Sequence, residues 1–420
     1  MSKKKNKDGL AYSQYTYRFN YRGEFLPQLL ELSKASKDLY NQAQYWVRQN
    51  FIFNGKMHWY KDVQQYMYDL PNLHGEINYR KLKAQTSQQI LKLLEKDWKS
   101  FFNAIKDYSQ SPEKYTGRPK LPGYKRSDVF NLIYTNQCCS IKNGMLKLAK
   151  DIAIKIPQPE RIQGVLCQCR IIPKKGYCTI EIIYEQEDLI LLDSSKYISV
   201  DMGVNSIMAC VSSGAEAILY NGKHIKSYNK DFNKKLAKAQ SLMPKIKTRL
   251  GKVQKKNSKL IRSLYTNRNN YMHDKMHKIS ASLIEYCFVN DIGTIVIGQN
   301  KGWKDESSMS KKTNQTFCQI PHAKLIDLIT YKAKRLGIKV ITHEESYTSK
   351  CDALAFEPIC KHESYSGKRV HRGLFKSSGG QIINADINGA LNILRKVVGD
   401  SVVRQIVGMG DWLTPYCVTL

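Results

Sequence analysis

The chain has 420 residues, 42% of them hydrophobic, which is enough to bury at least one large core and to form two or three domains. Its formal net charge of +31 predicts a polyanionic partner, because each phosphate neutralised by Lys or Arg releases counterions. We expect nucleic acid; a generally basic enzyme or a membrane-surface binder is the alternative. The sequence lacks an apolar run of about 18 residues and the apolar stretch of a signal peptide, so we expect a cytoplasmic protein with no membrane partner.

The N-terminal half combines helical and strand patterns. Tyr15, Tyr17, Phe19 and Tyr21 alternate with polar residues, which predicts a half-buried strand after a basic tail. Apolar residues at helical spacing predict helices over 25–49 and around 90–105. A Pro/Gly-containing connector at 117–126 then leads into short strands up to about residue 190, which we expect the N-terminal strand to join.

The C-terminal half alternates strands and helices. We expect a strand from Tyr197 to Asp201, an antiparallel partner from Ser206 to Ser212 and a third strand near 217–220. Helices are predicted near 321–336 and 386–396, with strands at 294–297 and 338–342. The returning helix should bury one face, formed by Met272, Met276, Ile279, Leu283 and Cys287. This order predicts an α/β domain with a mixed sheet.

Between Phe232 and His273 there are twelve Lys or Arg residues and no acidic residue. Solvated helix faces normally mix both signs of charge, so this stretch predicts a phosphate-binding arm rather than an ordinary exposed helix. We expect the helical pattern to break near Pro244 and Gly251. The predicted nucleic-acid-binding residues are Lys245, Lys247, Arg249, Lys252, Lys255 and Lys256 in the arm, with Lys125 and Arg126 from the connector.

The eleven cysteines lack the spacing of a disulfide framework, which is typical of reduced thiols. Those in strand-like segments are interpreted as core or incidental residues: Cys138, Cys139, Cys167, Cys169 and Cys178.

Two aspartates, Asp201 and Asp386, lie at the ends of predicted elements, where they could act as metal ligands for phosphodiester cleavage. Such chemistry requires carboxylates that converge from different elements around two divalent ions. Asp201 ends a predicted strand beside the turn residue Gly203, a common arrangement that alone proves little. Asp386 starts a predicted amphipathic helix, where an acidic residue also has a purely structural role as a cap.

Three segments together resemble the RuvC motifs of the TnpB family, the insertion-sequence-encoded OrfB-type transposases related to compact type V CRISPR effectors. They are YISVDMGVN at 197–205, ESYTS at 345–349 and NADINGALNI at 384–393. The resemblance covers essentially the whole chain. It implies an RNA-guided, magnesium-dependent DNA endonuclease encoded by a transposable element, with a guide RNA from the element end and double-stranded target DNA as partners.

The resemblance also implies the fold. We expect an α/β, RNase H-like RuvC nuclease domain at 196–420 and an N-terminal β-barrel wedge domain formed by 10–24 and 111–195. A helical recognition lobe at 25–110 is inserted into the wedge, and residues 1–9 form a disordered basic tail.

The sequence departs from the family pattern at the second motif. The strand at 294–297 is followed by Gly298, where most of the family has a Glu. Either the site is inactive, or another acid fills the gap. Some branches carry this Glu just before Tyr-Thr-Ser, where Glu344 and Glu345 stand. We predict that Asp201, Glu345 and Asp386 hold two magnesium ions, with Glu344 as the reserve carboxylate.

A second departure concerns the zinc ribbon, which in the family commonly has two Cys-x-x-Cys pairs. Here Cys351 and Cys360 stand far apart, with His362 and His371 nearby. We predict no structural zinc and a basic insert at 346–382. Two other functions remain open: a nuclease-inactive, RNA-guided DNA-binding repressor, and a DNA transposase that acts without RNA.

Overall fold

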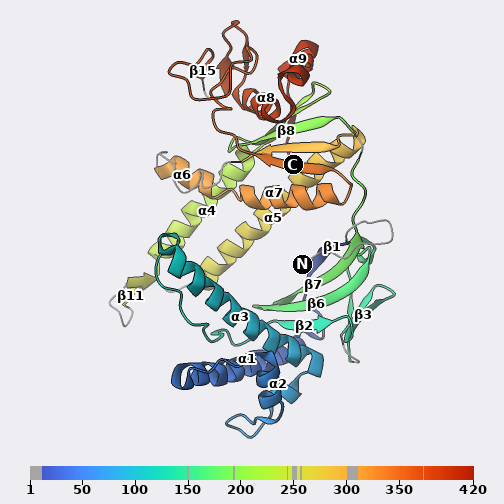
Figure 1. The fold of residues 1–420 in the computed structure, drawn as a ribbon, viewed down its shortest axis with the longest axis vertical. Helices are drawn as coiled ribbons and strands as arrows, with labels where there is room; N and C mark the ends of the chain where they lie inside the picture. Colours follow the sequence, from blue (N-terminus) through green and yellow to red (C-terminus); the bar gives the residue numbers. More distant parts are fainter. Residues whose placement is uncertain are drawn as a thin grey trace. The chain divides into compact units, whose positions relative to one another are not determined.

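The computed structural model describes residues 12–148, 151–192, 194–243, 245–247, 253–255, 258–299, 311–371 and 373–420. The chain divides into two compact units, residues 1–187 and 188–420, and each is described by itself (Figure 1). Among the described residues, no helix is both long enough and apolar enough to cross a membrane.

The helices of the first unit pack through one shared apolar core. They are α1 (Leu26–Asn54), α2 (Tyr60–Asp69) and α3 (Ala84–Gln110). Leu39 and Val47 of α1 and Leu94 and Trp98 of α3 are buried, so the helical spacing in the sequence correctly marked the inward faces.

Strands of the first unit form a sheet of order β1-β7-β6-β2 and a smaller sheet of order β3-β4-β5. The N-terminal strand β1 pairs antiparallel with β7, as its alternating pattern predicts. Burial raises the pKa of the Cys139 and Cys178 thiols, which lie in strands. The strands are β1 (Tyr12–Tyr21), β2 (Leu132–Thr135), β3 (Cys139–Lys142), β4 (Met145–Leu148), β5 (Ile152–Lys155), β6 (Val165–Lys174) and β7 (Tyr177–Glu187).

The second unit is built on a mixed sheet of order β14-β13-β8-β9-β10-β18. The strands β8, β9 and β10 form the expected antiparallel meander, while β13 runs parallel to both β8 and β14. These strands are β8 (Tyr197–Met202), β9 (Ser206–Ser212), β10 (Ala217–Asn221), β13 (Thr294–Gly298), β14 (Lys339–His343) and β18 (Tyr416–Val418). The α/β architecture with a mixed sheet is therefore confirmed for this unit.

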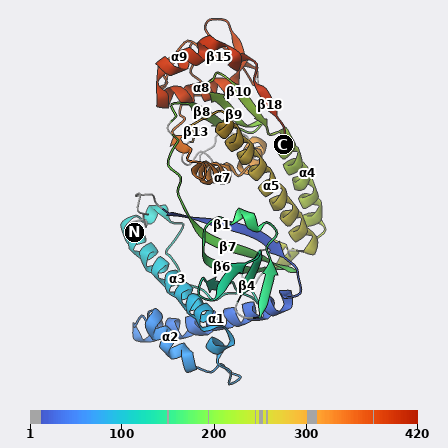
Figure 2. The same ribbon diagram turned by 90° about the vertical axis from the view of Figure 1, so that its right-hand side faces the viewer.

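Helices cover both faces of this sheet (Figure 2). Val200 and Ile297 point towards α5 (Lys259–Val289) and α7 (His322–Lys334), whereas Val296 packs with α8 (Ala385–Val398) and α9 (Asp400–Met409). Because side chains alternate along a strand, Asp201 and Gly298 face the α8 side. The returning helix α5 buries all five predicted apolar residues.

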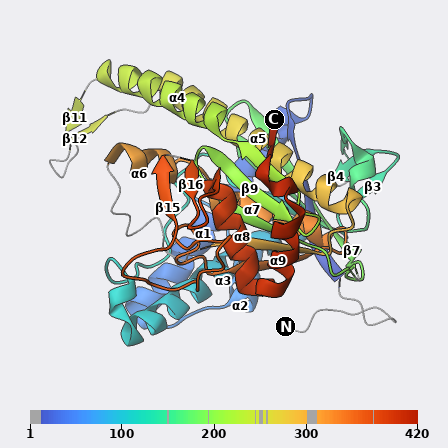
Figure 3. The ribbon, with the colours of Figure 1, turned by 90° about the horizontal axis from the view of Figure 1, so that it is seen from above.

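The basic arm is a pair of helices with a short hairpin between them (Figure 3). Helix α4 (Lys223–Ser241) packs on α5, where the rings of Tyr228 and Tyr271 stack at 3.8 Å. Between the helices, β11 (Lys245–Lys247) pairs with β12 (Val253–Lys255). The helical pattern does break between Ser241 and Lys259, where the sequence did not indicate strands; Pro244 and Gly251 themselves lie outside the described residues.

Candidate functional site

Asp201 lies near the end of β8, on the face of the sheet that α8 covers. Burial raises the pKa of its carboxyl group well above the usual range, and the nearby carboxylates of Glu345 and Asp386 raise it further. Arg369 acts in the opposite direction. Two of the acids predicted from the sequence, Glu345 and Asp386, therefore act electrostatically on Asp201, although β8, the loop after β14 and α8 supply the three separately.

A glycine of α8 gives Asp201 its space. A Cβ atom built on Gly389 would lie 2.6 Å from Oδ2 of Asp201, closer than nonbonded atoms approach. Helix α8 therefore packs against the carboxylate with bare backbone at this point, which explains why a residue of low helix propensity stands inside a helix.

Glu345 fills the space beside Gly298. Strand β14 ends at His343, which is paired with Gly298, and the following loop brings Glu345 back to that strand end. A Cβ atom built on Gly298 would lie 2.6 Å from Oε2 of Glu345. Burial, and secondarily Glu344, raises the pKa of Glu345 to about 7, while Lys396 lowers it. Gly298 therefore leaves room for a carboxylate that comes from another segment.

Glu344 has a different environment from Glu345. It is exposed and accepts hydrogen bonds from the backbone N–H and hydroxyl of Ser346 and from Nζ of Lys396 at 3.2 Å. These contacts make Glu344 a brace within its own loop, so the geometry favours Glu345 over the reserve carboxylate.

Asp386 occupies the first turn of α8 but leaves helix capping to another residue. The side chain of Asn384 accepts hydrogen bonds from the backbone N–H groups of Asp386 and Ile387. The Asp386 carboxylate instead lies 4.0 Å from Nη2 of Arg369. Asp386 is therefore not the N-cap, although it stands in the first turn, where a carboxylate favours the helix dipole.

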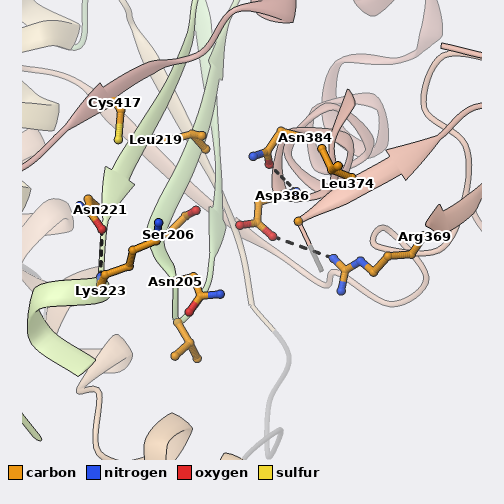
Figure 4. Close-up of a pocket in the computed structure, with 12 residues that line it drawn as sticks. Asn205, Ser206, Leu219, Asn221, Lys223, Arg369, Leu374, Asn384, Asp386 and Cys417 are labelled. Atoms are coloured by element: carbon orange, nitrogen blue, oxygen red, sulfur yellow. Dashed lines mark hydrogen bonds and ion pairs between the residues drawn. The ribbon is translucent and has the colours of Figure 1, made fainter. Parts of the chain in front are cut away.

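Asp386 and Arg369 line a cleft of about 460 Å³ in the second unit (Figure 4). Lys223, at the start of α4, stands on the wall opposite Asp386. Apolar side chains lie between these polar groups. The lining consists of Val204, Asn205, Ser206, Leu219, Asn221, Lys223, Arg369, Gly373, Leu374, Asn384, Asp386 and Cys417. Two basic groups beside a carboxylate suit a phosphodiester that approaches bound cations.

The donor set suits magnesium by its chemistry. All three acids offer hard oxygen ligands. Burial raises the pKa of Asp201 and of Glu345, and the repulsion of Asp201 by Glu345 and Asp386 is one that a cation would relieve. In the described part of the chain, however, no three His, Cys, Asp or Glu side chains already stand in a ligating arrangement.

The insert that follows Glu345 is organised by a buried carboxylate. Asp352 accepts hydrogen bonds from Leu354 and Ala355 in one turn and from Ser377 and Ser378 in another. These bonds join two turns that are distant in sequence.

The cysteines of the insert are engaged locally. The thiol of Cys351 is buried and donates to the carbonyl groups of Pro358 and Cys360, while Cys360 Sγ lies 3.4 Å from Nε2 of His362. His371 is an exposed residue at the end of β15 (Lys368–His371).

The predicted nucleic-acid-binding residues have different environments. Lys125 is engaged within the first unit, with Nζ 2.9 Å from Asp97 and 4.2 Å from the ring centre of Tyr40. Arg126 is exposed. The predicted arm residues Lys245, Lys247 and Lys255 lie in β11 and β12, while Arg249, Lys252 and Lys256 lie outside the described residues.

The sequence analysis assigned no role to Asn388, Gly389 and Asn392, although they stand in the motif at 384–393, and it did not identify Lys396 of α8 or Lys223 of the cleft wall. The sequence did contain a signal for three of them: the polar residues Asn388, Asn392 and Lys396 are spaced four residues apart, which places them on one side of a helix.

Comparisons with known proteins show which proteins this chain resembles. A family model described as a probable transposase, OrfB_IS605, matches residues 181–304, and a model described as Cas12f1-like, TNB domain, matches residues 322–393. The TnpB-like protein ORF457 of Acidianus two-tailed virus is 24% identical over 417 residues, which cover 89% of this chain and 84% of the viral protein.

Among solved structures, the Cas12f1–sgRNA–target DNA complex contains a similar chain. Its TM-score is 0.54 at 16% identity, covering 88% of this chain and 82% of that chain, which shows a shared fold. The family models and the shared fold together show a protein similar to probable transposases of the OrfB_IS605 kind and to Cas12f1. The chain is thus similar to proteins of the TnpB family.

Proposed function

We propose that this protein is an RNA-guided, magnesium-dependent DNA endonuclease encoded by a transposable element. One observation carries the proposal: three acids from separate elements approach the same face of α8. Asp201 packs against Gly389 of α8, Asp386 stands one turn earlier on that helix, and Glu345 fills the space beside Gly298, which also faces Ile393 of α8. Bringing carboxylates together away from water costs free energy, because like charges repel and burial disfavours the charged form. A purely structural role does not explain why three acids converge despite this cost.

Each acid would have a defined part. Asp201, Glu345 and Asp386 would hold two magnesium ions. Bound there, the ions would supply an activated water and stabilise charge on the leaving oxygen. Arg369 would help to orient the phosphate, because its guanidinium lies in the cleft beside Asp386. Lys223 would hold a neighbouring phosphate of the same strand from the opposite wall.

The nucleic-acid partners follow from charge and from the family. A formal net charge of +31 suits a long polyanion, and the Cas12f1 chain of similar fold was solved with sgRNA and target DNA. We infer a guide RNA from the element end and a double-stranded DNA target, recognised largely through backbone shape. The RuvC-type nuclease domain, the β-barrel wedge and the helical recognition lobe belong to this same proposal.

The test uses the full chain purified with its RNA. Copurified RNA is sequenced, and plasmid cleavage is measured with magnesium and with EDTA. We expect RNA of element-end sequence and cleavage that Asp201→Ala abolishes while RNA binding remains. Loss of RNA binding in the same variant would mean that Asp201 is structural.

A matched pair separates the two glutamates. Glu345→Gln should abolish cleavage, whereas Glu344→Gln should retain a measurable part of it, since Glu344 braces the loop. Guided DNA binding without cleavage by the wild type would favour the repressor. RNA-free strand joining would favour the direct transposase.

A further inference from the structure

Helix α8 carries a row of three polar side chains at successive intervals of four residues. Asn388, Asn392 and Lys396 form this row, which we call the α8 ladder. The side chains of Asn388 and Asn392 are fully buried, and that of Lys396 is 15% exposed. Spacing of four residues places all three on one side of the helix.

The two asparagines bind the backbone of the segment 348–353. Nδ2 of Asn388 donates to the carbonyl of Cys351 at 2.9 Å, and its Oδ1 accepts from the N–H of Ala353 at 3.0 Å. Nδ2 of Asn392 donates to the carbonyls of Thr348 at 2.9 Å and Cys351 at 2.7 Å. Backbone groups that would otherwise be buried without partners are thus satisfied by side chains of one helix.

Lys396 binds the preceding part of the same segment. Its Nζ donates to the carbonyls of Glu344 at 3.0 Å and Ser346 at 2.9 Å, and to Oε2 of Glu344 at 3.2 Å. The backbone is therefore fixed on both sides of Glu345.

Thr348 completes the connection to Glu345. Its hydroxyl donates to the carbonyl of Glu345 at 2.8 Å, and its backbone N–H donates to the same carbonyl at 3.2 Å. Thr348 in turn is bound by Asn392. The backbone of Glu345 thus reaches α8 through one intermediate residue.

We propose that the α8 ladder positions Glu345 and holds its carboxylate at Gly298. A loop residue can then act as a metal ligand at the end of β13, where the strand itself has no acidic residue. This inference rests on the proposed nuclease function. Asn388, Asn392 and Lys396 are positioning residues, because their contacts are with loop backbone and with Glu344.

The ladder also explains why a loop residue can be placed accurately. A metal ligand must be held to within a fraction of an ångström, and residues on regular elements meet this demand better than loop residues. The contacts to Glu344, Ser346, Thr348, Cys351 and Ala353 give the loop the rigidity of the helix that holds it.

Lys396→Met tests the proposal, because it keeps a straight side chain and removes the donor at the edge of the ladder. Lys396→Arg is the conservative variant. Lys278→Met is the matched control, since Lys278 lies on α5 in an exposed ion pair with Asp274. Three quantities are measured on the full chain: hydrogen exchange of residues 343–351, Mn²⁺ affinity by calorimetry without DNA, and kcat and KM for cleavage.

We expect Lys396→Met to speed exchange in 343–351, to weaken Mn²⁺ binding about 10- to 100-fold and to lower kcat with little change in KM. Lys396→Arg should restore most of each property, and Lys278→Met should match the wild type. Wild-type Mn²⁺ affinity and kcat in Lys396→Met would overturn the proposal. A wild type that neither bound Mn²⁺ nor cut DNA would overturn the proposed nuclease function itself. Failure of the function is thus seen in the wild type, whereas failure of the ladder proposal is seen in Lys396→Met.

Discussion

Oδ2 of Asp201 lies 2.6 Å from the point where Gly389 would carry a Cβ atom. Strand β8 and helix α8 therefore approach each other so closely at the carboxylate that only glycine fits on the helix. Asp386 stands one turn earlier on α8, so this close approach also brings the two aspartates together.

Gly389→Ala should abolish or strongly reduce cleavage without unfolding the protein. The added methyl group displaces the Asp201 carboxylate, whereas alanine in a helix stabilises it by about 0.5–1 kcal/mol relative to glycine. Gly408→Ala in α9 is the control, since a Cβ there would meet open space among the described residues. Thermal unfolding and plasmid cleavage check both variants; full activity in Gly389→Ala would contradict the packing argument.

Moving the acid to the strand should restore activity to a protein that lacks Glu345. Glu345→Ala should be inactive, and adding Gly298→Glu should recover cleavage at least about tenfold, because both carboxylates would serve the same metal pair. The new side chain also displaces Cδ1 of Ile393, which lies 2.5 Å from the Cβ position and can rotate. Initial cleavage rates of the single and double variants measure the effect. If the double variant were as inactive as Glu345→Ala alone, a carboxylate at position 298 would not replace that of Glu345.

Lys223→Ala should weaken substrate binding more than turnover. Loss of one phosphate contact is expected to raise KM about 5- to 10-fold and to reduce the salt dependence of DNA binding by about one ion. Lys339→Ala, in the exposed part of β14, is the control. Steady-state kinetics at several salt concentrations provide the measurement. An unchanged KM would remove Lys223 from the proposed strand-binding cleft.

Asp352→Asn should loosen the insert, whereas metal chelation should not. Asparagine cannot accept all the bonds that Asp352 receives from two turns, and the loss of such charge-assisted bonds costs about 2–4 kcal/mol. Limited proteolysis of residues 352–380 is the readout, with Asp231→Asn, in an exposed ion pair with Lys235, as control. Rapid cleavage of the insert in the wild type after zinc chelation would show that a metal holds it.

The protein should lose stability below neutral pH through His277. Burial, followed by His273, Lys332 and Lys324, lowers the pKa of His277 to about 4 from 6.5. The folded state therefore keeps His277 neutral while the unfolded chain takes up a proton, so stability present above pH 6.5 is lost as the pH falls towards 4.

His277→Gln should remove this loss. Relative to the wild type, the variant should gain about 1–2 kcal/mol between pH 7 and pH 4.5, a value reduced from the full pKa shift for solvent screening. Thermal unfolding from pH 4.5 to 8 tests it. A constant difference between variant and wild type across this range would exclude His277 as the cause.

Regular elements with a long repeat could be predicted from the sequence. The face of α5 and the meander β8–β10 carry periodic apolar residues, so local pattern and tertiary packing agree there. The edge strand β18 was missed because three residues are too few for a pattern, and its parallel pairing with β10 joins segments almost 200 residues apart.

The site was predictable only in part. Asp201 and Asp386 stand at the ends of recognisable elements. The sequence alone could not decide between Glu344 and Glu345, which are adjacent in a loop. That choice depends on Lys396, some fifty residues later, which binds Glu344 and leaves Glu345 at Gly298. Family resemblance, and not periodicity, indicated the relocated acid.

The α8 ladder has a mechanical consequence. One helix bears Asp386 and fastens the loop of Glu345, so a rigid tilt of that helix would carry both side chains as a single body. The distance between Asp386 and Glu345 would stay the same, and only their distance to Asp201 on the sheet would change. Any displacement of α8 would thus control the assembly of the three ligands through one coordinate.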